Sequence, residues 1–258
     1  MPEGDTIHRA ADQIASALDG RIPEEVLTPH PRRWMDEWPA RLRGRAVRSV
    51  DAHGKHLFLR FDGGLTVHSH LRMTGHWGVY RRGESWLRSP RRAWLVLRSG
   101  DWDVVEFDGP VLELISDSRA RSDPRFAELG QDVLGEQYDN ERFIARLRAS
   151  DPRRAVADAL LDQRIVAGIG NLWKAELCFA AGIDPWRELS ALNDDEAARL
   201  IELARELMRR SVQSGNWTRP RAVYRRAGLP CPRCSEIVRR RGQGENNRST
   251  YWCPGCQR

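Results

Sequence analysis

The chain has little lysine, few cysteines, no long apolar segment and no internal repeat. None of its apolar runs approaches the roughly 20 residues that a membrane-spanning helix requires, so we expect no membrane partner. Several charged residues occur among the first twelve positions, and the apolar core of a secretory signal is missing there. We therefore expect a cytoplasmic protein.

Lysine is scarce although the chain is rich in basic residues. Arginine supplies 40 of the 42 basic residues, and the only lysines are Lys55 and Lys174. Such a preference for arginine over lysine is what the composition of a genome can produce. A lysine ammonium is a compact point charge, whereas a guanidinium is a planar fork. Each lysine therefore raises the question of why arginine would not serve at its position.

Four of the five cysteines form two Cys-x-x-Cys pairs near the end of the chain. Cys231 and Cys234 are followed after eighteen residues by Cys253 and Cys256. This spacing favours one structural zinc ion held by four thiolates, with no open coordination position. A pair of disulfides is the alternative, and the absence of an export signal disfavours it. The fifth cysteine, Cys178, lies in an apolar stretch and is expected to be a core residue.

Positive charge is concentrated around these pairs. Residues 209–258 contain twelve arginines, no lysine and two acids, a net charge of +10, whereas the whole chain carries +6. Two short runs with β-branched and aromatic residues, 236–242 and 248–252, flank a turn-forming segment. A basic β-hairpin pinned by zinc is typical of a nucleic-acid-binding module. The alternative is a solvated charged face.

The periodicity of apolar residues divides the remaining chain into two parts. After an expected helix that has Asp5 as its N-cap, includes Leu18 and is ended by Gly20, strand patterns dominate to about residue 130. Helical patterns follow, including a capping box at Asn193–Glu196. Helices are expected at 141–149, 153–163 and 172–181, and strands at 57–61, 65–71, 93–98, 102–107 and 111–115. We predict an α+β protein with a β domain, either a sandwich or a barrel, at 1–132, a helical domain at 133–221 and a zinc finger at 222–258.

A glycine-rich turn, Gly168-Ile-Gly-Asn171, precedes one of the expected helices. A turn of this kind can leave backbone N–H groups pointing outward at the helix N-terminus, where they bind a phosphate. Asn171 at the N-cap would add a side-chain donor. Most such turns have no ligand, so the interpretation depends on the basic hairpin elsewhere in the chain.

The chain begins Met1-Pro2-Glu3-Gly4. Proline is a small penultimate residue, so we expect removal of Met1, which leaves the secondary amine of Pro2 at the terminus. α-Amines have an unperturbed pKa of roughly 8, and such an amine condenses with an aldehyde to an iminium ion. Glu3 would supply a carboxylate for proton transfer. An ordinary proline at the first turn of a helix is the alternative.

Together, the Met-Pro-Glu-Gly start, the Gly-Ile-Gly-Asn turn and the Tyr-Trp-Cys-Pro-Gly-Cys-Gln end resemble the formamidopyrimidine-DNA glycosylase and endonuclease VIII family. The resemblance covers essentially the whole chain. It implies a β-sandwich, a helix–two-turn–helix domain and a zinc finger hairpin. It also implies a bifunctional DNA glycosylase and abasic-site lyase of base excision repair, which acts as a monomer on double-stranded DNA with damaged bases or abasic sites and cleaves the strand by β,δ-elimination.

Carried over by position, the resemblance assigns roles to individual residues. Pro2 is the nucleophile, and Glu3 is the general acid and base. Lys55 contacts phosphates and assists catalysis, while Asn171 and Arg248 grip the phosphates that flank the lesion, Arg248 being also a catalytic residue. Glu176 matches a glutamate that the family keeps near the site.

The resemblance also places a DNA wedge in the loop that contains Arg72 and Met73. A flipped base leaves a gap in the stack, and Met73 would fill it as an apolar wedge. Packing of Met73 in the core at a strand end is the alternative. The chain departs from the common family pattern at Asp5-Thr6, where many members have a proline and a glutamate.

The start and the end of the chain look more like endonuclease VIII than like the oxidised-purine enzymes. The segment 214–230 is also short for a long base-capping loop. We therefore expect oxidised pyrimidines as substrates. An oxidised-purine glycosylase and a non-catalytic module that binds abasic DNA are the alternatives.

Overall fold

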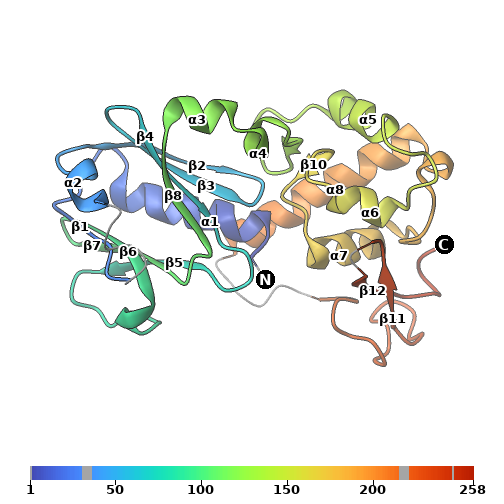
Figure 1. Cartoon of the computed structure of the whole chain (residues 1–258). Coiled ribbons are helices and arrows are strands. Elements are labelled where there is room, and N and C mark those ends of the chain that lie inside the picture. The colour runs from blue at the N-terminus through green and yellow to red at the C-terminus, as the bar shows by residue number, and fades with distance from the viewer. Residues whose placement is uncertain (1, 31–36, 215–220, 246) are drawn as a thin grey trace. The chain divides into compact units, whose positions relative to one another are not determined.

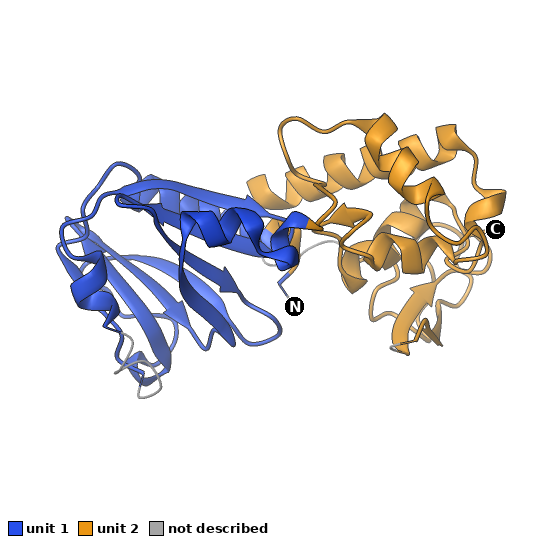
Figure 2. Ribbon diagram, turned by 45° about the horizontal axis from the view of Figure 1, so that its top comes forward, with its two compact units in different colours: residues 1–2, 6–127 blue, residues 3–5, 128–258 orange. Residues whose placement is uncertain are grey.

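The computed structural model describes residues 2–30, 37–214, 221–245 and 247–258 (Figure 1). The chain divides into two compact units (Figure 2). The first consists of Met1–Pro2 and Thr6–Ala127, and the second of Glu3–Asp5 and Glu128–Arg258. The start of the chain therefore contributes residues to both units. None of the helices in the described ranges is long and apolar enough to cross a membrane.

The first unit is a sandwich of two four-stranded antiparallel sheets, as predicted. One sheet has the order β2-β3-β4-β8 and the other β1-β6-β7-β5. The strands are β1 Glu25–Leu27, β2 Val47–His53, β3 His56–Phe61, β4 Leu65–His70, β5 His76–Arg81, β6 Ala93–Ser99, β7 Trp102–Phe107 and β8 Val111–Ser116. The helices are α1 Gly4–Leu18, α2 Trp38–Leu42, α3 Asp117–Ser122 and α4 Pro124–Ala127, with a 3₁₀ turn at Pro90–Arg92.

Apolar residues of α1 complete the core between the sheets. Ile14 and Leu18 of α1 are fully buried with Leu59 of β3 and Leu97 of β6. Successive side chains of a strand point to opposite faces of its sheet, so every second residue faces the space between the two sheets. α1 begins at Gly4, so Asp5 lies in its first turn and the expectation of Asp5 as N-cap is wrong. The helix does end just before Gly20, whose φ of 71° suits glycine.

The second unit is mainly helical and ends in a hairpin. Its elements are β9 Gln131–Asp132, α5 Asn140–Arg148, α6 Val156–Leu161, β10 Val166–Ala167, α7 Asn171–Ala181, a 3₁₀ turn at Leu189–Ala191, α8 Asp194–Gln213, β11 Arg239–Gln243 and β12 Arg248–Trp252. The predicted capping box is confirmed, because Asn193 and Glu196 exchange side-chain and backbone hydrogen bonds at the start of α8. Helix α6 is shorter than predicted.

Helix α7 is the centre of this unit. Every residue from Asn171 to Phe179 is buried, as in a helix that has neighbours on all sides. Its first turns pack against β12 and its length packs against α8. Cys178 is fully buried, which confirms it as a core residue. Val238, Cys231 and Cys253 belong to the same apolar cluster as α7, so the hairpin and the helices share one core.

Candidate active site

The carboxylate of Glu3 occupies the N-terminus of α7. Its Oε1 accepts a hydrogen bond from the backbone N–H of Leu172 at 2.9 Å. Its Oε2 accepts from Trp173 at 3.1 Å and from Gly170 at 3.2 Å. Only 1% of the residue is exposed. The positive end of the helix dipole and three N–H donors therefore hold a negatively charged side chain in one orientation.

This arrangement corrects the prediction for the glycine-rich turn. The N–H groups of Gly170, Leu172 and Trp173 were expected to bind a phosphate, but they donate to the chain's own carboxylate. The N–H of Gly168 donates to Oε1 of Gln163 at 3.0 Å. The N-cap is Gly170 and not Asn171, which is the first helical residue. The turn is a docking site for the N-terminal segment.

The N-terminal segment and the turn before α7 approach each other so closely that glycine is required at three positions. A Cβ atom on Gly170 would lie 2.4 Å from Cδ of Glu3, and one on Gly4 would lie 2.9 Å from Cα of Gly168. The N–H of Gly4 donates to the carbonyl of Gly168 at 2.9 Å. Gly168 has a φ of 107°, which L-residues with side chains rarely adopt. The three glycines let two backbone segments pack at a distance that no side chain would allow.

Asp5 strengthens the same docking. Its Oδ2 accepts a hydrogen bond from the hydroxyl of Ser211 on α8 at 2.6 Å, and the residue is buried. Asp5 is the position at which the chain departs from the common family pattern. Its side chain therefore ties the N-terminal segment to α8.

Pro2 directly precedes this docked segment. It is half-buried, belongs to the first unit and lies outside α1. Its covalent neighbour Glu3 belongs to the second unit.

Lys55 lies in the tight turn between β2 and β3. His53 and His56 pair across this turn, and Gly54 has a φ of 59°. A two-residue hairpin loop with glycine at its first position suits this geometry. Lys55 is half-buried there.

A histidine cluster that sequence reasoning missed lies beside this turn. Nδ1 of His56 and Nε2 of His68 are 2.9 Å apart, and Nδ1 of His68 is 3.1 Å from Oε2 of Glu113. With Glu113 ionised, His68 donates from Nδ1 and accepts at Nε2 from His56, which fixes both tautomers. Burial lowers the pKa of His56 to about 2, and neighbouring charges contribute less. The His56 ring is therefore neutral near pH 7. The alternation His68-Ser69-His70 on one strand was the available signal.

His70 joins the cluster to the next loop. Its ring centroid is 4.8 Å from that of His56, and its Nδ1 accepts from the backbone N–H of Arg72 at 3.2 Å. Burial lowers the pKa of His70 to about 4, with further contributions from Arg72, His68 and Lys55. The histidine therefore stays neutral and keeps Nδ1 as an acceptor, which supports Arg72 at its left-handed φ of 47°.

Met73 is presented to solvent by this loop. It is 64% exposed, so the alternative that it packs in the core is wrong. The backbone around it is braced from the side: the hydroxyl of Thr74 donates to the carbonyl of Asp108 at 3.2 Å, and Arg88 donates to the carbonyl of Thr74 at 2.8 Å and to Asp108. An exposed apolar side chain on a braced loop fits the predicted wedge.

Asn171 and Arg248 both belong to the contact of α7 with β12. Nδ2 of Asn171 donates to the carbonyl of Ser249 at 2.9 Å, and 8% of the residue is exposed. Its Oδ1 is buried and has no hydrogen-bond partner among the described residues. Arg248 is the first residue of β12 and is exposed, opposite Gln243 of β11. The structure therefore brings Asn171 next to the strand that carries Arg248.

The four paired cysteines form one cluster. All four Sγ atoms lie within 4.8 Å of one another. Cys231 and Cys256 are 3.8 Å apart and Cys234 and Cys253 are 3.3 Å apart, far beyond the roughly 2.05 Å of a disulfide bond. Zinc–sulfur bonds of about 2.3 Å in a tetrahedron require sulfur separations of roughly 3.8 Å. The donor set and its spacing fit a four-thiolate metal site.

Glu176 has a structural task in the helical unit. Its Oε1 accepts from the backbone N–H groups of Val223 and Tyr224 at 3.0 and 2.8 Å, and its Oε2 from that of Ala222 at 2.8 Å. The carboxylate fixes the segment that leads from α8 into the zinc hairpin. Sequence reasoning placed Glu176 near the site but did not identify these contacts, because they join residues 46 to 48 positions apart.

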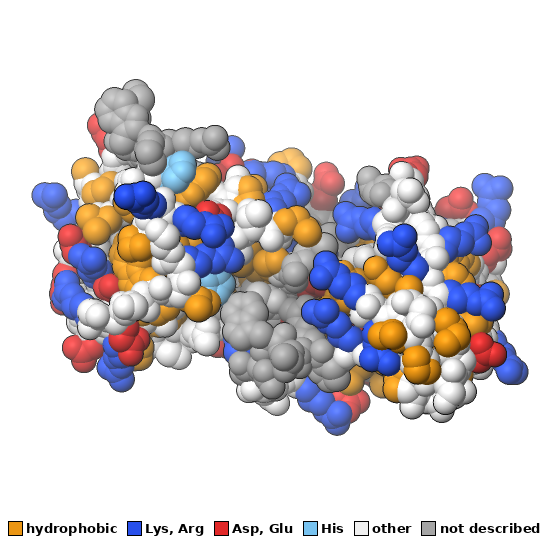
Figure 3. Space-filling view, turned by 90° about the horizontal axis from the view of Figure 1, so that it is seen from below, with side chains coloured by type: hydrophobic (Ala, Val, Ile, Leu, Met, Phe, Trp, Pro, Cys, Tyr) orange, Lys and Arg blue, Asp and Glu red, His pale blue; other side chains and the backbone are white. Residues whose placement is uncertain are grey.

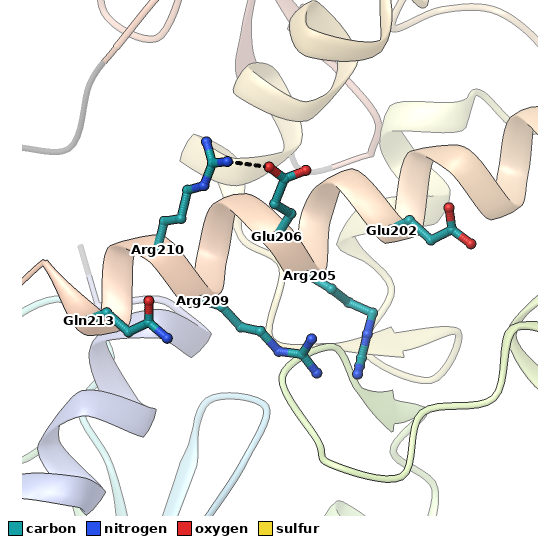
Figure 4. A pocket seen from close by; sticks show the side chains of 6 residues that line it. All are labelled: Glu202, Arg205, Glu206, Arg209, Arg210 and Gln213. Carbon is teal, nitrogen blue, oxygen red and sulfur yellow. Dashed lines mark ion pairs between the residues drawn. The ribbon is translucent and has the colours of Figure 1, made fainter.

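An open hollow of about 370 Å³ on α8 carries none of the predicted site residues. Six residues of the helix line it: Glu202, Arg205, Glu206, Arg209, Arg210 and Gln213. In Figure 4 the side chains of Arg205 and Arg209 extend to one side of α8, whereas Glu206 and Arg210 form an ion pair on another. Arg205 donates to the carbonyls of Val133 and Gly135. The hollow is a charged helix surface. The face in Figure 3 also shows many Lys and Arg side chains on each unit.

Comparisons with known proteins agree with these features. Residues 1–112 match the formamidopyrimidine-DNA glycosylase N-terminal domain, and residues 129–220 match the formamidopyrimidine-DNA glycosylase H2TH domain. The chain is 44% identical to a probable endonuclease 8 2 of Streptomyces coelicolor, covering 100% of this chain and 94% of that protein. It is 37% identical to a DNA-(apurinic or apyrimidinic site) lyase Nei2 of Mycolicibacterium smegmatis, covering 100% and 99%. The fold is that of Lactococcus lactis formamidopyrimidine-DNA glycosylase bound to DNA containing an abasic site, with a TM-score of 0.82, 22% identity and full coverage of both chains.

Proposed function

Because the chain belongs to the formamidopyrimidine-DNA glycosylase family, close to its endonuclease 8 members, it is a DNA glycosylase and abasic-site lyase of base excision repair, and we propose that its nucleophile is the amine of Pro2. Removal of Met1 would expose this secondary amine. Attack of its nitrogen on C1′ expels the damaged base, and opening of the sugar ring gives an iminium ion. Loss of a proton from C2′ then expels the 3′ phosphate, and a second elimination expels the 5′ phosphate.

The observation that carries this proposal is the fixed position of Glu3. Three backbone N–H groups hold the carboxylate of Glu3, the residue that directly follows Pro2 in the chain. A general acid and base must be within hydrogen-bond reach of the proton that it moves. The position supports Glu3 as the group that protonates the sugar ring oxygen and exchanges protons during elimination.

Borohydride trapping tests the nucleophile. Reduction of the iminium ion links the protein covalently to abasic DNA, and we expect this adduct from protein that begins at Pro2. Pro2→Gly, or retention of Met1, should abolish it while the protein still binds DNA. A wild-type yield of adduct from either form would contradict the assignment of Pro2.

Residues of both units are proposed to bind double-stranded DNA. Lys55 and Arg248 supply cations for phosphates, and Asn171 supplies the second N–H of its Nδ2. Arg72 and Met73 are proposed to enter the gap left by the flipped base, with Met73 as the wedge. Arg248 and Lys55 are also proposed to assist elimination. We further propose that the protein acts as a monomer on nucleoid DNA in the cytoplasm.

One structural zinc ion is proposed at the four cysteines. With all four ligands supplied by protein, it would hold the hairpin and take no part in the reaction. Metal analysis should find one equivalent of zinc. Cys256→Ser should lose it and should weaken DNA binding more than it lowers trapping at saturating DNA. An absence of zinc from protein that retains full DNA affinity would contradict this proposal.

Oxidised pyrimidines are the proposed substrates, together with abasic sites. The name of the first relative, a probable endonuclease 8, is consistent with the pyrimidine preference, and that of the second, an abasic-site lyase, supports action at abasic sites. Residues 215–220 of the short segment expected to lack a base-capping loop lie outside the described residues. Duplexes with thymine glycol, dihydrouracil, 8-oxoguanine and an abasic site should be compared under single-turnover conditions. Faster excision of 8-oxoguanine than of both pyrimidines would identify an oxidised-purine enzyme instead.

A further inference from the structure

Lys174 is a buried lysine to which the proposed mechanism gives no task. It lies on α7, and none of its surface is exposed. Its Nζ donates to the hydroxyl of Thr250 on β12 at 2.6 Å. Charged side chains are almost never fully buried unless they have a partner, because removing a charge from water is costly. A lysine in this position therefore requires an explanation.

Titratable groups around Lys174 come from several elements. Burial lowers its pKa to about 8, Cys178 of α7, Asp158 of α6 and Glu3 raise it, and Arg248 of β12 lowers it. Arg248 is thus close enough to repel the ammonium. Two cations kept near each other are an arrangement that packing alone does not favour.

The hydrogen bond from Lys174 to Thr250 is the first of a series that includes both strands of the hairpin. The hydroxyl of Thr250 donates to Oε1 of Gln243 on β11 at 2.6 Å, and Nε2 of Gln243 donates to the carbonyl of Pro185 at 2.9 Å. Thr250 and Gln243 are buried. Gln243 is the residue that pairs with Arg248 across the hairpin. The chain of hydrogen bonds therefore fixes the strand that carries Arg248 and the residue opposite it.

Asn171 adds a second tie one helical turn earlier. Its Nδ2 donates to the carbonyl of Ser249, the residue between Arg248 and Thr250. Positions three apart lie on the same face of a helix, so Asn171 and Lys174 hold consecutive residues of β12. Arg248 is the exposed residue directly before these two anchored positions.

We propose that Lys174 is a positioning residue for Arg248. The ammonium ties β12 to α7, so that the guanidinium of Arg248 is held where it meets a DNA phosphate. This inference rests on the proposed role of Arg248 as a phosphate contact. A compact ammonium fits because it must reach one hydroxyl at 2.6 Å inside a packed core, where a planar guanidinium is larger.

Variants can separate the effect of the hydrogen bond between Lys174 and Thr250 from the effect of the Lys174 charge. Lys174→Met removes both the ammonium and the hydrogen bond, Thr250→Val removes the hydrogen bond but keeps the ammonium, and Thr250→Ser keeps both as the matched control. Arg248→Ala is combined with each of the first two. Affinity is measured against salt for a duplex with a non-cleavable tetrahydrofuran abasic analogue. Zinc content and the melting temperature are measured for every variant.

Loss of one phosphate contact lowers the slope of log affinity against log salt concentration by about 1. We expect this decrease, with roughly tenfold weaker binding, from Arg248→Ala and likewise from Lys174→Met and Thr250→Val. Each double variant with Arg248→Ala should bind within about twofold of Arg248→Ala alone, because both changes remove one contact. Thr250→Ser should bind like the wild type.

Other outcomes overturn the proposal. If the losses multiply in the double variants, Lys174 does not act through Arg248. If Thr250→Val binds normally, the hydrogen bond is irrelevant. Loss of zinc from both Lys174→Met and Thr250→Val would mean that the hydrogen bond between Lys174 and Thr250 is needed for folding of the hairpin and not for positioning Arg248. Arg248→Ala alone tests the role of Arg248, and borohydride trapping of the wild type tests the lyase, so failure of the proposed function is recognised separately.

Discussion

Replacing Gly170 by alanine tests whether the docked Glu3 controls the chemistry. The backbone there is extended, with φ of −121° and ψ of −166°, so alanine causes no conformational strain. The new Cβ, however, would lie 2.4 Å from Cδ of Glu3. The carboxylate must therefore move by about 1 Å or more to reach ordinary contact distance, and its bonds to Gly170, Leu172 and Trp173 weaken together.

Two magnitudes follow from this displacement. Overpacking a well-packed site costs about 1–3 kcal/mol of unfolding free energy. A misplacement of about 1 Å at a reacting group costs up to roughly 100-fold in rate. Gly170→Ala should therefore slow single-turnover borohydride trapping by about 10- to 100-fold, while the affinity for tetrahydrofuran-containing DNA changes less than about threefold.

Gly135→Ala is the matched control, because the three atoms nearest to its Cβ would all belong to Asp132, the closest being the backbone oxygen at 3.1 Å, and none belongs to Glu3. Both variants are compared by trapping rate, affinity and urea unfolding. A wild-type trapping rate in folded Gly170→Ala protein would refute the view that the position of Glu3 sets the rate.

Three further predictions concern the proposed wedge Met73, Glu176, which holds the segment before the zinc hairpin, and the histidine cluster. Met73→Ala should weaken binding of abasic DNA by about three- to tenfold without changing stability by more than about 0.5 kcal/mol, whereas Ile22→Ala, which also trims an exposed apolar residue, should leave binding unchanged in the same titration. Glu176→Gln should lower the unfolding free energy by about 1–3 kcal/mol in urea, because its new N–H₂ group faces a backbone donor; unchanged stability would contradict the anchoring role. Because the folded pKa of His70 is about 4 and the unfolded value is about 6.5, the unfolded state binds the extra proton, so stability should fall as the pH drops from 6.5 to 4. His70→Gln should show a shallower fall in urea midpoints over this range, and an equally steep one would exclude His70 as its cause.

Local signals in the sequence predicted much of the fold. Alternating residues predicted the strands at 57–61 and 65–71, which pair as β3 and β4, and Asn193–Glu196 predicted the start of α8. The short strand β1 and the edge strands β2 and β5 were missed, because three residues or a weak alternation give no periodic signal. The histidine cluster was missed for another reason: His56 and His68 meet only through the register of β3 with β4, which composition does not reveal.

The glycine-rich turn shows where sequence reasoning reaches its limit. The local pattern correctly indicated a helix N-terminus that binds an anion, because the first N–H groups of any helix lack partners within the helix. It could not distinguish a phosphate from a carboxylate, since both satisfy the same donors. The carboxylate comes from Glu3, 167 positions from Gly170, and only the folded chain brings the two together. Since Glu3 engages the N–H groups of Gly170, Leu172 and Trp173, the phosphate contact that we propose at this turn uses the side chain of Asn171, whose Nδ2 has two hydrogens and uses one on Ser249. Asn171→Ala should therefore lower the salt slope of DNA binding by less than Arg248→Ala does, because the amide carries no charge to release a counterion.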